Sequence, residues 1–154
     1  MYRTILLAYD GSLEGRLALR EGARLAQVCG ARVVLMAIVE PSSEFFVGGV
    51  GGVYIPPDRT EEVQKILDEG LARLNGMGLV PEGRLERGEP TERISKIALD
   101  VSADLVVVGH HKQGAMARWL KGSVTASLSD TLNCSLLVAR LEISDEVLFG
   151  KDRP

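Results

Sequence analysis

The chain has few of the residues that mark several large classes of protein. Its two cysteines, Cys29 and Cys134, lie far apart with no CxxC spacing. Two cysteines are too few for a disulfide framework, so we expect buried free thiols in a reducing compartment. No apolar run approaches the length of a membrane span, and the short apolar segment after Met1 lacks the pattern of a signal peptide. These absences predict a cytoplasmic protein with no membrane span.

A charge excess of one sign is also missing. There are 18 Lys and Arg against 21 Asp and Glu, so the net charge is −3. Such a balance provides no overall basic field, and we therefore expect no nucleic-acid partner. What the chain has in excess is glycine, with 17 residues, where an average usage of about 7% gives roughly eleven. The length predicts one domain. The tail, residues 142–154, falls outside the strand and helix pattern described below, which leaves residues 1–141 for the domain.

Short apolar runs recur along the chain and do not alternate with polar residues. Continuous runs of this kind are typical of parallel strands buried on both faces. A weaker candidate at 83–87 mixes Leu85 with charges, as an edge strand does. The four continuous runs are Ile5–Ala8, Val33–Val39, Leu105–Val108 and Leu136–Val138.

Between the runs, apolar residues repeat at helical spacing and occupy one face only. Four such stripes alternate with the strands, and this order predicts an open α/β sandwich with helices on both faces of a parallel sheet. Ser12 is a candidate N-cap for the first helix, Gly30 a candidate C-terminal glycine, and Pro90 suits the first turn of the third helix. The stripes are Ala18–Cys29, Val63–Leu74, Ile94–Val101 and Val124–Leu132.

Two segments fall outside this pattern. Residues 40–57 contain four closely spaced glycines and then Pro56-Pro57, which predicts a loop with neither helix nor strand. A loop of that length is either a lid or plain surface chain, and both interpretations stand. The tail, residues 142–154, mixes apolar and charged residues, and either docks or frays.

In an open parallel sheet, ligands bind beyond the carboxyl ends of the strands. The first strand runs into Asp10-Gly11-Ser12, and the fourth runs into Gly109 and a stretch from 105 to 129 that contains Lys and Arg but no acidic residue. Glycines, a helix N-terminus and positive charge together predict an anion site, with phosphate as the expected anion. A turn aspartate and a solvated basic loop are the alternative interpretations.

The same segments resemble the universal stress protein family. The resemblance extends to about Arg140. Nucleotide-binding members carry Gly, two residues, Gly, nine residues and then Gly-Ser or Gly-Thr; this chain has Gly109, two histidines, Lys112, nine residues and then Gly122-Ser123. The resemblance rests on Ile5–Ser12, Gly88-Glu89-Pro90, Ala103–Gly109, Gly122-Ser123-Val124 and Cys134–Val138.

The resemblance implies a Rossmann-like fold, of the adenine nucleotide alpha hydrolase type, with strand order 3-2-1-4-5. It also implies an adenine nucleotide site at the point where that order reverses. Asp10 would contact the ribose or a phosphate-bound Mg²⁺, and the backbone of Ile38 would receive the adenine edge. The other implied binding residues are Ala8, Val108, Gly109, Lys112, Gly114, Gly122, Ser123 and Val124.

Lys112 stands where the family keeps glycine. Its side chain either crowds the phosphates or pairs with them as a point charge. The expected function is that of a cytoplasmic stress protein that binds ATP, or another adenine nucleotide such as AMP, as a regulatory ligand. Two alternatives stay open, namely a stress interaction protein without nucleotide and a slow ATP hydrolase. The family also implies a homodimer formed through the last strand.

Several enzyme classes lack their motifs here. A P-loop GxxxxGK[ST] and a GxSxG elbow are absent, and the first strand is followed by Asp10-Gly11-Ser12 rather than GxGxxG. No residue has the surroundings of a dedicated general base. We therefore expect no catalytic residue and, at most, weak ATPase activity.

Overall fold

A computed structural model describes residues 1–41, 47–48, 52–53, 57–110 and 128–140. Helices follow the first three strands of the main sheet, as the apolar pattern predicts, while the short strands β3 and β4 interrupt the alternation after β2. Of the fourth predicted helix, Val124–Leu132, residues 124–127 lie outside the described residues and 128–131 are helical. The elements are β1 (Thr4–Ala8), α1 (Leu13–Cys29), β2 (Arg32–Val39), β3 (Val47–Gly48), β4 (Gly52–Val53), α2 (Thr60–Gly76), β5 (Glu82–Arg87), α3 (Pro90–Asp100), β6 (Leu105–Gly109) and β7 (Ser135–Ala139).

Five strands form one parallel sheet in the order β5-β2-β1-β6-β7. Numbered along the chain without the short pair β3 and β4, this is the order 3-2-1-4-5, so the predicted fold class is confirmed. The charged segment at 82–87 is an edge strand, again as predicted. Three of the four continuous apolar runs form the central strands β2, β1 and β6, whose two faces are both covered. The fourth run, Leu136–Val138, belongs to the edge strand β7 and is only partly buried.

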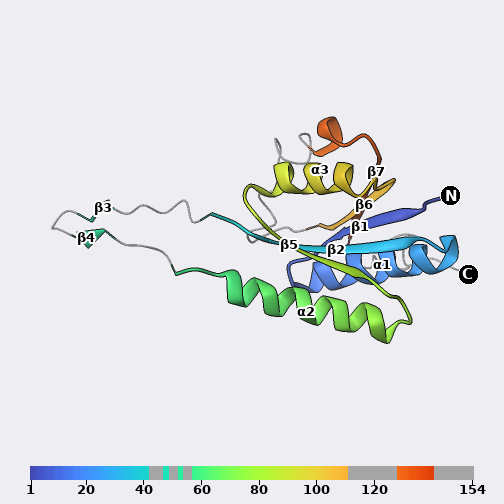
Figure 1. The fold of residues 1–154 in the computed structure, drawn as a ribbon, viewed down its shortest axis with the longest axis horizontal. Helices are drawn as coiled ribbons and strands as arrows, with labels where there is room; N and C mark the ends of the chain where they lie inside the picture. The colour runs from blue at the N-terminus through green and yellow to red at the C-terminus, as the bar shows by residue number, and fades with distance from the viewer. Residues whose placement is uncertain (42–46, 49–51, 54–56, 111–127, 141–154) are drawn as a thin grey trace, which may run out of the picture.

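Helices cover both faces of the sheet. Figure 1 shows α1 and α2 on one side and α3 on the other. Successive residues of β1 enter different cores, with Leu7 packed among α1 and α2 and Leu6 packed among residues of α3. Each apolar run therefore serves two cores at once, which is the physical reason that it does not alternate.

The predicted helix ends are confirmed. Ser12 caps α1, its hydroxyl accepting a hydrogen bond from the Gly15 N–H, and α1 ends at Gly30 in the left-handed conformation with φ 63°. Pro90 occupies the first turn of α3, and the carboxylate of Glu89 accepts hydrogen bonds from two backbone N–H groups of that turn. Because Glu89 already caps this N-terminus, α3 offers no ready anion site there.

Two predictions need correction. Residues 40–57 are not wholly loop, since β3 and β4 pair as a short antiparallel ladder, Val47 with Val53 and Gly48 with Gly52. Two segments joined by three residues with glycines satisfy the geometry of a hairpin, which the composition alone concealed. Cys29 and Cys134 are free thiols but only half-buried, because each lies at the end or edge of an element rather than inside one.

No helix within the described residues is long and apolar enough to cross a membrane. Residues 141–154, which hold the predicted tail, lie outside the described part of the chain.

Candidate functional site

The sheet has one point at which the strand order reverses. β1 pairs with β2 on one side and with β6 on the other, while the chain continues from β1 to β2 and returns to β6 only after α3. The connections that follow β1 and β6 therefore leave in opposite directions from the carboxyl ends of these strands, which is the place where open α/β sheets bind ligands. Asp10 follows β1 and Gly109 ends β6, so two sequence-predicted residues meet at this point.

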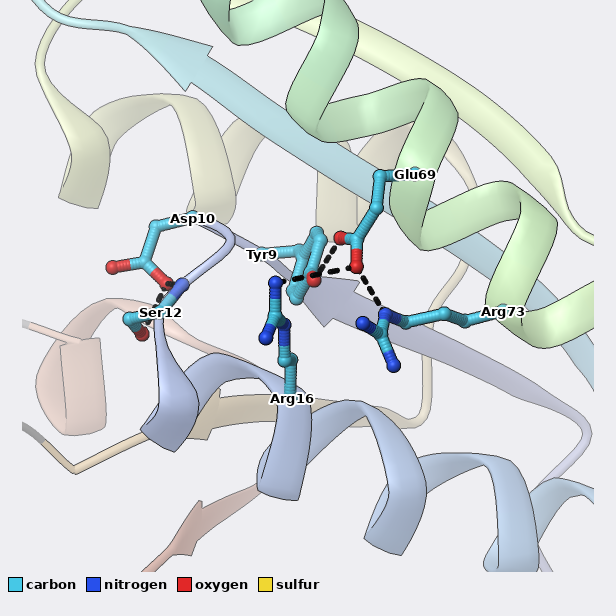
Figure 2. A network of polar contacts seen from close by, with 6 residues as sticks. All are labelled: Tyr9, Asp10, Ser12, Arg16, Glu69 and Arg73. Carbon is cyan, nitrogen blue, oxygen red and sulfur yellow. Dashed lines mark hydrogen bonds and ion pairs between the residues drawn. The ribbon is translucent and has the colours of Figure 1, made fainter.

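Asp10 forms a tight turn with the start of α1. Its Oδ1 accepts a hydrogen bond from the Ser12 N–H at 3.0 Å and another from the Ser12 hydroxyl at 2.6 Å, as Figure 2 shows. The Ser12 oxygen in turn accepts from the Gly15 N–H at 2.9 Å. The turn and the cap are thus one hydrogen-bonded unit, so the structural interpretation of Asp10 holds whatever ligand it contacts.

Gly109 packs tightly against the first turn of α1. A Cβ placed on Gly109 would lie 2.8 Å from the carbonyl oxygen of Glu14 and 3.0 Å from the Gly15 nitrogen. Any side chain at this position would therefore collide with backbone. The sequence suggested that this glycine allows a ligand to approach the backbone. The structure shows that its lack of a side chain allows the first turn of α1 to pack against the end of β6.

The backbone of Ile38 faces the same opening. Met36 accepts a hydrogen bond from the Tyr9 N–H and Val39 accepts one from the Gly88 N–H, so these two β2 residues direct their carbonyls to opposite sides. Backbone groups along a strand alternate in direction, and Ile38 must therefore point toward the β1 side, as Met36 does. The ladder between β1 and β2 ends at Ala8 and Met36, which places the Ile38 N–H and C=O beyond the last pair.

Ala8 and Val108 lie side by side on β1 and β6, but their side chains belong to the core beneath α3. They are 3% and 1% exposed. Such side chains are packed into the core with α3 and offer a ligand no polar contact, so only the backbone of these two residues lies at the strand ends. The remaining predicted residues, Lys112, Gly114, Gly122, Ser123 and Val124, lie outside the described residues. In the described ranges no group of three or more His, Cys, Asp or Glu side chains gathers as a metal site.

A polar network that the sequence did not reveal lies directly beside Asp10. Tyr9 is 2% exposed and its hydroxyl donates a hydrogen bond to Glu69 of α2. Glu69 also forms ion pairs with Arg16 of α1, at 3.5 Å, and with Arg73 of α2 (Figure 2). The only signal in the sequence is a tyrosine at the end of an apolar strand, and nothing in the spacing connects it with residue 69.

The network shifts the pKa values of its members. Burial, reinforced by the hydrogen bond to Glu69, raises the pKa of Tyr9 to about 12. Burial acts against the charge of Glu69, but the hydrogen bonds from Tyr9 and Arg73 and the nearby arginines outweigh it and lower the pKa of that carboxyl. At neutral pH the network therefore consists of a neutral phenol, a carboxylate and two guanidinium groups.

A cavity of about 600 Å³ lies elsewhere, between α3 and the segment that leads into β7. No predicted site residue lines it, and it lies near the amino end of β7 rather than at the carboxyl ends of the strands. Its walls are Ser95, Lys96, Ala98, Leu99, Ser102, Ala103, Thr131, Leu132, Asn133 and Cys134.

The fold and this strand-end site define an open α/β protein of the kind that holds ligands at a topological switch point. The chain matches the model of the universal stress protein family over residues 1–140, and it belongs to that family.

Comparisons with individual proteins support the same family assignment. A universal stress protein of Thermus aquaticus is 32% identical over 142 residues, which span 91% of this chain and all of the relative. A universal stress protein in complex with cAMP is 25% identical, with a TM-score of 0.66, covering 93% of this chain and 99% of that one. The Archaeoglobus fulgidus universal stress protein in complex with dAMP has a TM-score of 0.64 at 22% identity, covers 90% and 98%, and so shows the shared fold alone.

Proposed function

We propose that this protein binds an adenine nucleotide, ATP in the first instance, as a regulatory ligand at the reversal point between β1 and β6. The observation that carries the proposal is the backbone of Ile38, whose N–H and C=O face the space beyond the end of the β1 ladder. A donor and an acceptor on the same side of a strand match the donor and acceptor on the edge of an adenine ring. Asp10 and Gly109 stand beside this edge.

Different residues bind the adenine, the ribose and the phosphates in this proposal. Ile38 binds the adenine edge, and the backbone at Ala8 and Val108 lies beside the nucleotide next to Gly109. Asp10 accepts a hydrogen bond from the ribose or helps to hold a Mg²⁺ ion carried by the phosphates. The phosphates lie over the glycine segment, with Gly114, Gly122, Ser123 and Val124 as backbone and hydroxyl donors and Lys112 as a point charge.

A solved relative supports the choice of ligand class. The family member at 25% identity was crystallised with cAMP, an adenine nucleotide, and this chain aligns with 99% of it. The nucleotide acts as a switch only if it binds two conformations or assembly states unequally. Assembly through the edge strand β7 is the state that we propose it controls, in a cytoplasmic stress response.

A comparison of two aspartates tests this proposal. Asp58 forms the same turn as Asp10, its Oδ1 accepting from the Thr60 N–H at 3.0 Å and the Thr60 hydroxyl at 2.6 Å. It precedes α2, and its ion-pair partner is Arg87 at the end of the edge strand β5. Asp10→Asn should weaken ATP binding about tenfold in calorimetry with Mg²⁺, since a hydrogen bond to a charged group is lost. Asp58→Asn should leave the affinity unchanged.

The alternatives give different results. A wild-type protein that carries no nucleotide after purification and gives no heat with ATP, ADP, AMP or cAMP would be an interaction protein instead. Steady release of phosphate above the background of a variant with a bulky residue at Gly122 would indicate a slow ATP hydrolase. Replacing Lys112 by glycine separates its two roles, because affinity rises if the side chain crowds the phosphates and falls if it pairs with them.

A further inference from the structure

Tyr9 occupies an unusual place between two helices. A Cβ placed on Gly70 of α2 would lie 2.7 Å from the Tyr9 ring, and one placed on Gly15 of α1 would lie 3.4 Å from the other side of the ring. Both helices therefore approach the ring at a position without a side chain. The Tyr9 ring, which we call the wedge, fills the space between Gly15 and Gly70 and so separates the first turn of α1 from α2.

That first turn is also what supports the candidate site. A Cβ on Gly15 would come within 2.5 Å of the Asp10 Oδ1, and the Gly15 nitrogen lies against Gly109. Residue 15 therefore lies close to the Tyr9 ring, the Asp10 carboxylate and the end of β6, and it has no side chain that would separate them.

The hydroxyl of Tyr9 holds the ring in place through a hydrogen bond to α2. It donates to Glu69, and Glu69 is held in turn by Arg16 from α1 and Arg73 from α2. Arg16 is the residue after Gly15, so the network ties the same turn to α2 from its outer side (Figure 2). Because the carboxylate has two other partners, removal of the hydroxyl leaves no charge unpaired, and Tyr9→Phe should fold.

We infer that Tyr9, tethered through Glu69, is a positioning residue that holds the turn formed by Asp10, Ser12 and Gly15 in the geometry needed to bind the nucleotide. The inference rests on the proposed function for its ligand, but the geometry of the turn can be measured without one. Neither Tyr9 nor Glu69 needs to touch the nucleotide, since both act through α1.

Matched variants are available for each partner. Tyr2 packs half-buried against the same core at the other end of β1, so Tyr2→Phe controls for Tyr9→Phe. Glu82 forms ion pairs with Arg32 and Arg84 and is 38% exposed, against 35% for Glu69, so Glu82→Ala controls for Glu69→Ala. Glu69→Gln keeps an acceptor for the Tyr9 hydroxyl and serves as a rescue variant.

The first measurement is amide hydrogen exchange without ligand. The Ser12 and Gly15 N–H groups donate to Asp10 and Ser12, and both should exchange about three to ten times faster in Tyr9→Phe and Glu69→Ala. Glu69→Gln should recover part of the protection. The two control variants should exchange as the wild type does.

The second measurement is the dissociation constant for ATP and cAMP. Tyr9→Phe and Glu69→Ala should raise it about three- to tenfold, at a thermal stability no lower than that of the controls. In the Asp10→Asn background the effect of Tyr9→Phe should vanish, since a positioning residue acts through the group that it positions.

The outcomes separate the two proposals. Unchanged exchange and unchanged affinity in Tyr9→Phe would overturn the positioning role and leave nucleotide binding intact, as would an effect that persists in full beside Asp10→Asn. Faster exchange at Ser12 and Gly15 in a protein that binds no nucleotide would support the positioning of the turn and refute its ligand.

Discussion

Gly109, at the end of β6, lies against the backbone of Glu14 in the first turn of α1, so closely that a Cβ on Gly109 would be 2.8 Å from the Glu14 carbonyl oxygen. The contact joins two segments almost a hundred residues apart in sequence. It makes the position of α1, and with it Asp10, dependent on the absence of one methyl group.

Gly109→Ala should therefore destabilise the fold by about 1–3 kcal/mol, the usual cost of inserting a methyl group against atoms that cannot move aside. Urea unfolding followed by circular dichroism measures the change. Gly76→Ala, at the end of α2, is the control, because a Cβ there meets nothing within 4 Å. An equal change in the free energy of unfolding of both variants would show that α1 can move away from Gly109 at little cost.

Ser12→Ala should lower the free energy of unfolding by about 1 kcal/mol, the typical effect of losing an N-cap hydroxyl. The hydroxyl serves twice here, since it accepts from Gly15 and donates to Asp10. Ser12→Thr retains the hydroxyl and should remain close to the wild type in thermal unfolding. A Ser12→Ala protein as stable as Ser12→Thr would mean that solvent replaces the cap.

Tyr9 should titrate far above an ordinary tyrosine, at a pKa of about 12 instead of 10.0. The folded protein disfavours the phenolate form of Tyr9. The protonated hydroxyl therefore makes its full contribution to the free energy of unfolding below pH 10, and that contribution is lost as the pH rises toward 12. In a pH titration followed by tyrosinate absorbance, Tyr9→Phe should lack the tyrosine that ionises at the highest pH. The free energy of unfolding of that variant should also fall less steeply as the pH rises above 10. A Tyr9 that titrates near pH 10 would contradict the burial and the hydrogen bond to Glu69.

Asp104 ties the start of β1 to the loop before β6. Its carboxylate accepts from the backbone N–H groups of Arg3 and Thr4, and these bonds lower its pKa from 3.8 although desolvation opposes them. A depressed pKa contributes stability above the unfolded value, and that contribution disappears as the pH falls through the folded value.

Asp104→Asn should consequently lose about 1 kcal/mol of stability near neutral pH and show a flatter loss of stability in acid. Chemical unfolding at several pH values measures both effects. Asp100→Asn breaks only an exposed ion pair with Lys96 and should change stability by less than about 0.5 kcal/mol. Parallel acid profiles for wild type and Asp104→Asn would contradict the assignment.

Much of the fold could be predicted because its signals are local. Ile5–Ala8 and Leu105–Val108 are apolar without alternation, and Ser12, Gly30 and Pro90 mark helix ends by their own chemistry. The hairpin of β3 and β4 was missed because its glycines also suit an irregular loop. Asp10 and Gly109 could be suspected separately, from the ends of two strands.

What could not be predicted depends on register and on helix docking. The resemblance implied a role for the Ile38 backbone, but its direction toward β1 follows only from the end of the ladder at Ala8 and Met36 and from the hydrogen bond of Met36 with Tyr9. Likewise, the contact of Tyr9 with Gly15 and Gly70 requires two helices to lie at particular heights over one strand. No periodicity within a helix carries that information.

The amino-acid sequence by itself determined the class of fold, since apolar runs buried on two faces and helices with one apolar stripe have only one common way to pack. It also showed an excess of glycine and indicated local roles for a few of them, such as Gly30 at the end of α1. The tertiary structure decided that Gly15, Gly70 and Gly109 are points of close contact between helices and strand ends. The physical reason is that a missing side chain leaves room for another element, and only the packed fold shows which element comes near enough to use that room.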